Sequence, residues 1–361
     1  MEYRSSRRCP EKISVIGLGC ANLLGSRNEK KEVIKTAIDN GVNFFDLALA
    51  TWEDYEIFAE AISGRREKVI TQIHFGAVYE EGKYGWTRDL GKIREQFALQ
   101  VKLFGYTDMG YIHCVDDNED LQEVLQGGIW DLMQEMKAKG AVRHLGFSSH
   151  NSAIAESLVS TGLVDMFMFS VNPAYDYRAG EYSIGEPSYR ASLYQECEKM
   201  GVGISVMKVF AGGQLLDAKT SLYDFALTQA QCFQYALDRP GVLTVLPGIR
   251  NMSDLQTVLK FTSATAKEKD YGFIGEFVPK SAYGKCVYCN HCQPCPMGID
   301  IGFVNKCYDL ALAGDELIFS HYSSLPATAS SCAKCGHCES RCPFRVKQME
   351  RMEKIAERFG K

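Results

Sequence analysis

The sequence predicts a (β/α)8 barrel of the TIM type followed by a small, mainly α-helical, cysteine-rich domain. Three observations lead to this α/β fold class. Short apolar segments alternate with amphipathic helical segments over roughly the first 250 residues, the usual size of such a barrel. The turn after the first apolar segment lacks the glycine pattern of the main competing fold. Two dense runs of cysteines follow the last barrel segment.

The predicted strands are short and almost wholly apolar, as expected when helices and the barrel interior cover both faces of a parallel sheet. Eight strands are expected in order at residues 13–18, 43–46, 69–74, 110–114, 144–148, 166–171, 203–208 and 242–247. The intervening helices are expected at residues 29–39, 55–62, 90–103, 121–139, 152–160, 188–200 and 227–237. Eight strand-helix units in succession predict a closed barrel.

A doubly wound open sheet is the alternative for alternating strands and helices. That fold expects the turn G-x-G-x-x-G after its first strand. The segment Gly17-Leu18-Gly19-Cys20-Ala21-Asn22 lacks the third glycine, so the barrel is preferred. In a barrel of this kind the functional residues lie at the carboxyl ends of the strands.

The two cysteine runs share one spacing, three cysteines at gaps of two residues and a fourth followed by proline. The first run is Cys286, Cys289, Cys292 and Cys295, and the second is Cys332, Cys335, Cys338 and Cys342. This spacing is typical of [4Fe-4S] ligation, and in two-cluster ferredoxins the fourth cysteine of each run binds the other cluster. The prediction is therefore two [4Fe-4S] clusters, with Cys342 completing the first and Cys295 the second.

Paired zinc sites are the alternative, but they need only two separated Cys-x2-Cys pairs each. A disulfide framework is disfavoured because most of these cysteines lie too close along the chain to pair without strain. A linker is expected over residues 264–283, which divides the chain into a barrel at residues 1–270 and a ferredoxin-like domain at residues 271–361. That domain is expected to carry helices near residues 301–313 and 346–359. The other cysteines are interpreted as reduced structural thiols: Cys9, Cys20, Cys114, Cys197, Cys232 and Cys307.

Composition narrows the cellular setting. The chain has 361 residues, 46% hydrophobic and 24% charged, with a net charge of −5 and no run of basic residues, which argues against nucleic-acid binding. No segment has the pattern of a signal peptide or a membrane span. A cytoplasmic protein is therefore expected, and its oxygen-sensitive clusters predict an anaerobic or strongly reducing setting.

Several short motifs in barrel order resemble the aldo-keto reductase family, and the whole chain resembles the bacterial subgroup with a C-terminal ferredoxin-type domain. The motifs are Gly17-Leu18-Gly19, Gly41-Val42-Asn43-Phe44-Phe45-Asp46, Tyr111-Ile112-His113, Arg143-His144-Leu145-Gly146-Phe147-Ser148-Ser149-His150, Val206-Met207-Lys208 with Gly212-Gly213, and Leu246-Pro247-Gly248. The resemblance implies reduction of a carbonyl by NADPH, with an Asp, Tyr, Lys and His tetrad around the reacting oxygen.

Two members of that tetrad match and two do not. Asp46 and His113 occupy the Asp and His positions, but Thr51 stands where the family has its Tyr and His74 where it has its Lys. A threonine hydroxyl is a far weaker acid than a phenol. Because an imidazole titrates near neutral pH, we expect His74 and His113 to form a rearranged acid/base pair that Asp46 orients.

The resemblance also implies positions for the nucleotide. The nicotinamide ring would lie at strand ends, and the phosphates at the loop and helix after the eighth strand. The corresponding residues here are Ser148, Ser149, Asn172 and Lys208 at the strand ends, and Gly248 and Arg250 in the loop.

Three functions follow. The first is an NADP(H)-dependent reductase of a carbonyl or related small organic substrate. The second is a reductase that takes single electrons from ferredoxin or flavodoxin through the two clusters, without hydride transfer. The third is a non-catalytic electron-transfer or redox-sensing protein. The resemblance favours the first.

Overall fold

Eight parallel strands form the centre of the structure, a computed structural model that describes residues 1–49, 51–80, 83–277, 284, 286–312 and 318–360. In sheet order they are β12 (Val242–Val245), β11 (Gly203–Met207), β10 (Met166–Ser170), β9 (Val142–Ser149), β8 (Thr107–Ile112), β5 (Ile70–Phe75), β4 (Phe44–Asp46) and β3 (Leu18–Gly19). Backbone hydrogen bonds from Gly17 to Val245 and from Gly19 to Pro247 join the two edges. The sheet therefore closes into a barrel, which confirms the predicted fold class.

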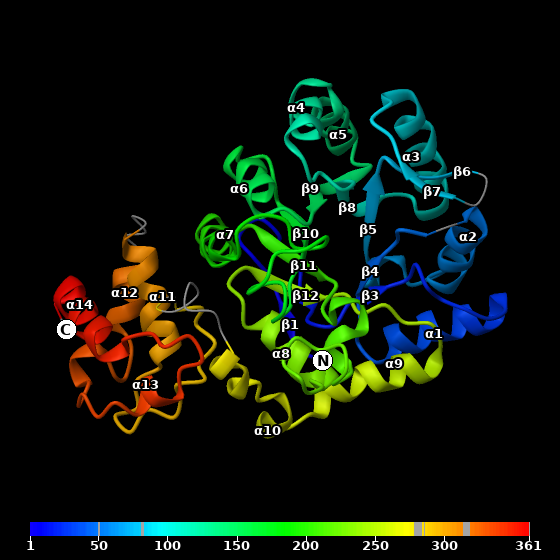
Figure 1. Ribbon diagram of the computed structural model, residues 1–361. Helices are drawn as coiled ribbons and strands as arrows, with labels where there is room; N and C mark the ends of the chain where they lie inside the picture. The colour runs from blue at the N-terminus through cyan, green and yellow to red at the C-terminus, as the bar shows by residue number, and fades with distance from the viewer. Residues whose placement is uncertain (50, 81–82, 278–283, 285, 313–317, 361) are drawn as a thin grey trace.

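Helices surround this barrel, as Figure 1 shows. They are α1 (Arg27–Asp39), α2 (Trp52–Ala61), α3 (Leu90–Phe104), α4 (Asn118–Gln126), α5 (Ile129–Ala138), α6 (Ser152–Ser160), α7 (Pro187–Met200), α8 (Gln229–Leu237) and α9 (Met252–Leu259). Short 3-10 turns lie at Arg66–Lys68, Ala211–Leu216, Lys260–Ser263, Gly272–Phe277 and Ala329–Ser331. The long helices direct apolar side chains toward the sheet. In α1, for example, Val33, Ile34 and Ala37 are buried.

Three local features differ from the expected elements. The first expected strand is divided, because β2 (Ile13–Ser14) pairs antiparallel with β1 (Tyr3–Arg4) and leaves only β3 in the barrel. The helix expected at residues 121–139 breaks at Gly128, whose φ of 82° is left-handed and ends helical geometry. A hairpin of β6 (Ala77–Glu80) and β7 (Lys83–Trp86) extends from the end of β5.

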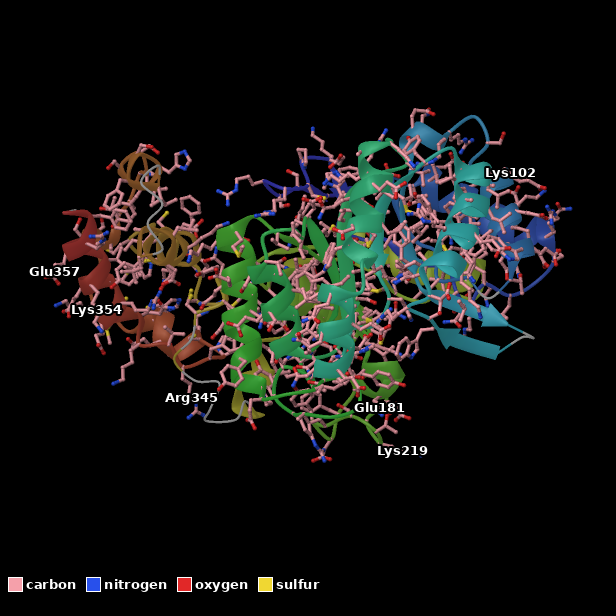
Figure 2. All side chains as sticks on the ribbon, turned by 90° about the horizontal axis from the view of Figure 1, so that it is seen from above. Lys102, Glu181, Lys219, Arg345, Lys354 and Glu357 are labelled. Carbon is pink, nitrogen blue, oxygen red and sulfur yellow. The ribbon has the colours of Figure 1, made fainter. Side chains whose placement is uncertain are left out.

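The cysteine-rich C-terminal part is helical. It contains α11 (Ile301–Leu312), α12 (Ile318–Ser323), α13 (His337–Arg341) and α14 (Gln348–Phe359), packed around a core of its own that includes Val304, Tyr322 and Ile355. Lys354 and Glu357 on α14 lie at the end of the molecule away from the barrel (Figure 2). No helix within the described ranges is both long and apolar enough to span a bilayer.

The C-terminal part packs on the barrel beside α7 and α8 (Figure 1). Gln195 of α7 donates to the carbonyl of Cys286 over 3.0 Å, and Phe344 is buried in the same apolar cluster as the barrel core. In the expected linker, α10 (Ala266–Lys269) and the turn Gly272–Phe277 are ordered elements, whereas residues 278–283 lie outside the described part. The division at residues 270 and 271 stays a prediction.

Candidate active site at the carboxyl ends of the barrel strands

Three neighbouring strands bring the predicted acid/base residues together. Asp46 ends β4, His74 lies near the end of β5, and His113 directly follows β8. All three side chains are buried inside the barrel mouth. Asp46 Oδ1 lies 2.8 Å from His74 Nε2, and His74 Nδ1 lies 3.2 Å from His113 Nδ1. The residues form one continuous hydrogen-bonded chain from carboxylate to imidazole to imidazole.

A polar layer beneath this chain fixes the carboxylate. Gln72 Nε2 donates to Asp46 Oδ1 over 2.7 Å, and Ser205 Oγ donates to Gln72 Oε1 over 2.8 Å. The ring of Tyr111 meets that of His74 edge-on at 6.2 Å between centroids. Sequence reasoning did not identify Gln72, Ser205 or Tyr111 as site residues. A signal was available for Gln72: it precedes His74 by two residues, and side chains two residues apart along a strand lie on the same face.

The hydrogen bonds define which ring nitrogens carry protons. Asp46 as a carboxylate only accepts, so His74 Nε2–H donates to it and His74 Nδ1 carries a lone pair. His113 Nδ1–H then donates to His74 Nδ1, which leaves His113 Nε2 as a proton acceptor. Burial and the nearby charges of His74 and Arg88 lower the pKa of His113 to about 2. His113 is therefore a neutral imidazole at pH 7.

Arg88 secures the backbone beneath His113. Its Nη2 donates to the His113 carbonyl over 2.8 Å, and the same nitrogen lies 2.6 Å from Asp120 Oδ2 in a buried ion pair. The guanidinium therefore holds the position of His113 through the main chain. Its positive charge also adds to the penalty for protonating the imidazole.

Thr51, which stands at the family's Tyr position, has a structural task. Its Oγ1 accepts from the amide of Asp54 at 3.2 Å and donates to Asp54 Oδ2 at 2.8 Å, so Thr51 caps the N-terminus of α2. Nearby, the Tyr55 hydroxyl donates to the Leu47 carbonyl over 2.8 Å inside the protein. A threonine engaged in a helix cap is not positioned to replace a phenol as proton donor.

The residues predicted to hold the nicotinamide lie side by side at the ends of β9, β10 and β11. Ser148 Oγ accepts from the amide of Cys114 over 2.8 Å, and Asn172 Nδ2 donates to the Lys208 carbonyl over 2.8 Å. Lys208 itself has a left-handed φ of 57°, and its ammonium lies 4.2 Å from the ring centroid of Tyr182. These hydrogen bonds connect neighbouring loops at the carboxyl ends of β8 to β11, which together form the rim of the barrel mouth. The loops after β10 and β11 also border a cavity of about 360 Å³.

Ser149 belongs to a second polar cluster on the same rim, which sequence reasoning did not identify. Its Oγ and the amide of His150 both donate to Asp116 Oδ1, at 3.0 and 2.6 Å. Asp116 Oδ2 lies 2.8 Å from His150 Nδ1 and 3.2 Å from Cys114 Sγ. Although burial opposes its ionisation, the hydrogen bonds from His150 lower the pKa of Asp116 to about 2. Each Asp116 carboxylate oxygen therefore has two hydrogen-bonding contacts, and the cluster joins the loop after β8 to the loop after β9.

The residues predicted to bind phosphates follow β12. Gly248 pairs with Gly19 across the closing edge of the barrel, and Arg250 precedes α9, whose cap is Asn251. The Arg250 guanidinium lies 2.9 Å from Asp254 Oδ2 and remains largely exposed. The start of α9 thus presents backbone amides next to a cation, an arrangement suited to an anionic group.

The two cysteine runs have matching backbone turns. Tyr288 and Asn290 in the first run have φ of 59°, and Lys334 and Gly336 in the second have φ of 54° and 74°. In each run these residues flank the second cysteine. Left-handed residues on both sides of a cysteine turn the chain sharply.

Several thiols of the two runs influence one another's pKa. Burial, followed by the charges of Cys289, Cys286 and Cys342, raises the pKa of Cys292 above its usual range. In the same way burial, with Cys332 among the neighbouring charges, raises the pKa of Cys338. The assignment of Cys342 to the first cluster stays a prediction.

The fold and the site agree with a match to a known family. A profile of the aldo/keto reductase family matches residues 15–231, more than half of the chain, and the chain belongs to this family. It is therefore an oxidoreductase. A curated relative, the "Uncharacterized oxidoreductase YqkF" of Bacillus subtilis, is 24% identical over 280 residues, which cover 70% of this chain and 88% of that protein.

Solved structures share the barrel. The aldo-keto reductase AKR11C1 from Bacillus halodurans, in its holo form, has a TM-score of 0.60 at 19% identity and covers 74% of this chain and 94% of its own. An aldo-keto reductase from Klebsiella pneumoniae in complex with NADPH has a TM-score of 0.52 at 15% identity and covers 74% and 93%. At these identities the likeness establishes the fold.

Proposed function

We propose that this protein is an NADP(H)-dependent oxidoreductase that reduces a carbonyl or a related small organic substrate, with Asp46, His74 and His113 as its acid/base group. The observation that carries the proposal is the hydrogen-bonded chain from Asp46 through His74 to His113 at the barrel mouth. Membership of the aldo/keto reductase family supports it, as do similar folds described in complex with NADP or NADPH.

Each residue of the chain has a distinct role in this proposal. In the direction of reduction the site would first take up one proton from solvent, so that His74 Nδ1–H donates to His113 Nδ1 and His113 Nε2 carries a proton. His113 Nε2–H would then give its proton to the substrate oxygen while the His74 Nδ1 proton passes to His113 Nδ1, which restores the resting bond. His74 relays the resulting charge, and Asp46 fixes its tautomer and stabilises its protonated form, as an orienting carboxylate does for an imidazole base. Bound NADPH would supply the hydride. Proton transfer through the two imidazoles replaces the phenol and lysine of the family.

The nucleotide would lie along the rim from β9 to the start of α9. Ser148, Ser149, Asn172 and Lys208 are proposed to border the nicotinamide, and Gly248 and Arg250 the phosphates. The hydrogen-bonded rim supports this placement because its geometry is fixed before a ligand binds, which reduces the ordering cost of binding. Arg250 would exchange its exposed ion pair with Asp254 for a phosphate.

Anaerobic titration with NADPH, followed by nucleotide fluorescence, tests this function. The full-length protein should bind NADPH and oxidise it in the presence of a carbonyl substrate from a panel of aldehydes and ketones. Arg250→Gln should weaken NADPH binding, whereas Arg27→Gln, a partly exposed arginine of α1 that also pairs with a carboxylate, should not. Absence of NADPH binding by the wild-type protein would refute the proposal.

We further propose that the two cysteine runs hold two [4Fe-4S] clusters, one on Cys286, Cys289, Cys292 and Cys342 and one on Cys332, Cys335, Cys338 and Cys295. The matching left-handed turns and the mutual influence of the thiols on their pKa support these ligand sets. When bound, such clusters transfer single electrons. Cys342→Ser and Cys286→Ser should abolish the same electron paramagnetic resonance signal, and Cys295→Ser should abolish the other.

A buried cation supports the first cluster independently. Arg239 is 3% exposed, its Nη2 donates to the Tyr271 hydroxyl over 3.0 Å, and its Nε has no hydrogen-bond partner. Within the part of the chain that the structure describes, no carboxylate lies within ion-pair distance of it. Buried charges are normally paired. Because Arg239 and the Cys289 thiol influence each other's pKa, an anionic cluster there would supply the missing countercharge.

Delivery of single electrons to the barrel is the second candidate function, and a line of contacts favours it. From the first cysteine loop, the ring of His291 lies 4.2 Å from that of Tyr271, which lies 5.1 Å from Tyr235. The Tyr235 hydroxyl donates to Asp176, whose amide donates to the carbonyl of Asn172 at the barrel mouth. Turnover with reduced ferredoxin or flavodoxin, but not with NADPH, would select this function.

A further inference from the structure

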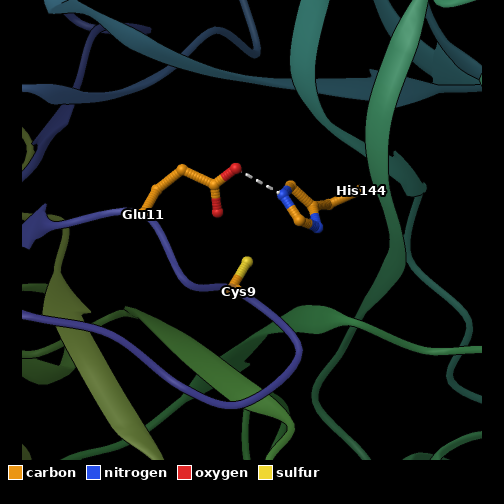
Figure 3. A group of neighbouring side chains, drawn as sticks. All are labelled: Cys9, Glu11 and His144. Atoms are coloured by element: carbon orange, nitrogen blue, oxygen red, sulfur yellow. Dashed lines mark hydrogen bonds and ion pairs between the residues drawn. The ribbon is translucent and has the colours of Figure 1, made fainter.

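A compact group of metal-ligating side chains lies at the end of the barrel opposite the candidate active site. Cys9 and Glu11 belong to the N-terminal segment between β1 and β2, and His144 lies near the start of β9. The Cys9 sulfur, a carboxylate oxygen of Glu11 and a ring nitrogen of His144 all lie within 4.8 Å of one another. Figure 3 shows the Cys9 sulfur directed toward the gap between the other two side chains.

The distances suit a small tetrahedral ion. Glu11 Oε1 lies 2.8 Å from His144 Nε2. Ligand bonds of about 2.0 to 2.3 Å to a tetrahedral zinc ion place neighbouring ligand atoms about 3.3 to 3.7 Å apart. The Glu11–His144 pair would therefore need to open by only about 0.5 Å to admit the ion. One thiolate and one carboxylate would balance its two positive charges, with His144 as a neutral ligand.

Two further observations point to a ligand. Although the Glu11 side chain is 30% exposed, its Oε2 is buried and has no hydrogen-bond partner among the residues that the structure describes, whereas a buried carboxylate oxygen normally has one. On the other side of the His144 ring, Asp165 Oδ2 lies within ion-pair distance, 3.6 Å, of Nδ1, the nitrogen that faces away from Glu11. Asp165 is held in turn by Lys137 Nζ at 2.7 Å and by the amide of Leu145 at 3.1 Å. A carboxylate behind a histidine is the usual support of a zinc ligand.

A simple ion pair or a harder metal ion fits the group less well than zinc. Ion pairing between Glu11 and His144 alone leaves Glu11 Oε2 without a partner among the described residues, and the fully buried Cys9 thiol then has a weak contact with the Met109 sulfur at 3.9 Å. Calcium and magnesium prefer oxygen ligands alone, whereas a mixed sulfur, nitrogen and oxygen set favours zinc. The comparable trio of Cys114, Asp116 and His150 differs because both oxygens of its carboxylate are already saturated.

We propose that Cys9, Glu11 and His144 bind one zinc ion, with Asp165 positioning His144 and a water as the fourth ligand. Glu11 is partly exposed, which leaves solvent access for that water. The barrel end opposite the strand carboxyl termini serves stability rather than chemistry in this fold. The ion would therefore fasten the N-terminal segment across the bottom of the barrel.

Zinc content of the full-length protein, purified anaerobically with its iron in place, tests the site. We expect one zinc per chain in the wild type, none in Cys9→Ser, and one in the matched control Cys114→Ser. X-ray absorption at the zinc edge should show a single sulfur at about 2.3 Å with nitrogen and oxygen at about 2.0 to 2.1 Å. Equal zinc in the wild type and Cys9→Ser, loss with Cys114→Ser instead, or a shell of several sulfurs would overturn the proposal.

Milder variants cover the case in which Cys9→Ser does not fold. Glu11→Gln keeps the side-chain volume on a partly exposed residue, and Asp165→Asn keeps the contact with His144 Nδ1 but not the charge. Chelator competition should show zinc affinity falling about 10- to 100-fold in Asp165→Asn, the usual effect of removing such support. Added zinc should also raise the thermal midpoint of the wild type more than that of Glu11→Gln. Unchanged affinity in both variants would refute the site.

Discussion

Replacement of His74 by glutamine separates proton transfer from hydrogen bonding at the barrel mouth. Glutamine has an N–H that can donate to Asp46 and an oxygen that can accept from His113, so it preserves the polarity of the chain. It cannot be protonated and deprotonated as an imidazole can. His74→Gln should therefore leave the site assembled but stop the relay of charge between Asp46 and His113.

The magnitudes follow from the contacts that change. General acid/base catalysis contributes about 10²- to 10⁴-fold, which corresponds to about 2.7 to 5.5 kcal/mol of activation free energy. The lost ring contacts of His74, at 6.2 Å from Tyr111 and 5.1 Å from His113, should cost only about 0.5 to 1.5 kcal/mol of unfolding free energy. Turnover of NADPH with a carbonyl substrate should thus fall by at least about 100-fold while the protein stays folded.

The assay needs kcat and KM for the wild type and His74→Gln, together with thermal unfolding of both. The matched control is Thr51→Ala, which removes the hydroxyl at the family's Tyr position. If His74→Gln retains turnover within about threefold of the wild type, the acid/base role is refuted. If Thr51→Ala loses turnover while His74→Gln does not, the proton passes through the threonine.

Three further outcomes are expected. Thr51→Ala should lower the unfolding free energy by about 1 kcal/mol, as measured by urea denaturation, because it removes the cap of α2. His113 has a folded-state pKa near 2, below that of an unfolded histidine. The unfolded chain therefore binds the proton first, and stability falls as pH drops below about 6.5, by up to about 1.4 kcal/mol per pH unit. His113→Asn should flatten that slope in denaturation curves recorded between pH 6.5 and 4. Arg239→Met should lower the reduction potential of the first cluster in a titration followed by electron paramagnetic resonance, because the reduced and more negative cluster loses a nearby cation; an unchanged potential would place the cluster away from Arg239.

The barrel could be predicted because its signal is local. Each strand is an apolar run, and polar residues such as Asp46 and His113 interrupt the runs where function lies in this fold. The assignment of the fourth cysteine of each run to the opposite cluster also comes from spacing alone, and it stays a prediction. These patterns need no knowledge of which distant segments meet.

Long-range pairing explains what the sequence did not reveal. Ser14, at the point where the first strand divides, exchanges hydrogen bonds with Asn43. The Ser14 amide donates to Asn43 Oδ1 over 2.8 Å, and the Asn43 amide donates to Ser14 Oγ over 3.0 Å. Gln72 orients Asp46 only because Ser205, 133 residues later in the chain, fixes its amide. The Thr51 cap, in contrast, has a local signal, a threonine followed three residues later by Asp54, which is a helix-start pattern.

With Thr51 at the family's Tyr position and His74 at its Lys position, the proposed site would handle charge differently from that of the family. A phenol next to an ammonium gives up its proton because the fixed cation stabilises the phenolate, so proton donation depends on a permanent neighbouring charge. In the proposed site the nearby anion is Asp46, which lies 2.8 Å from His74 Nε2, while burial lowers the pKa of His113 to about 2. A positive charge on His113 is therefore unstable unless an anion lies beside it. A developing alkoxide on the substrate would supply at His113 the negative charge that Asp46 supplies at His74. In the proposed mechanism, proton transfer would therefore become favourable only when the substrate oxygen gains charge, which would couple protonation to reduction whether the electrons arrive as a hydride or singly.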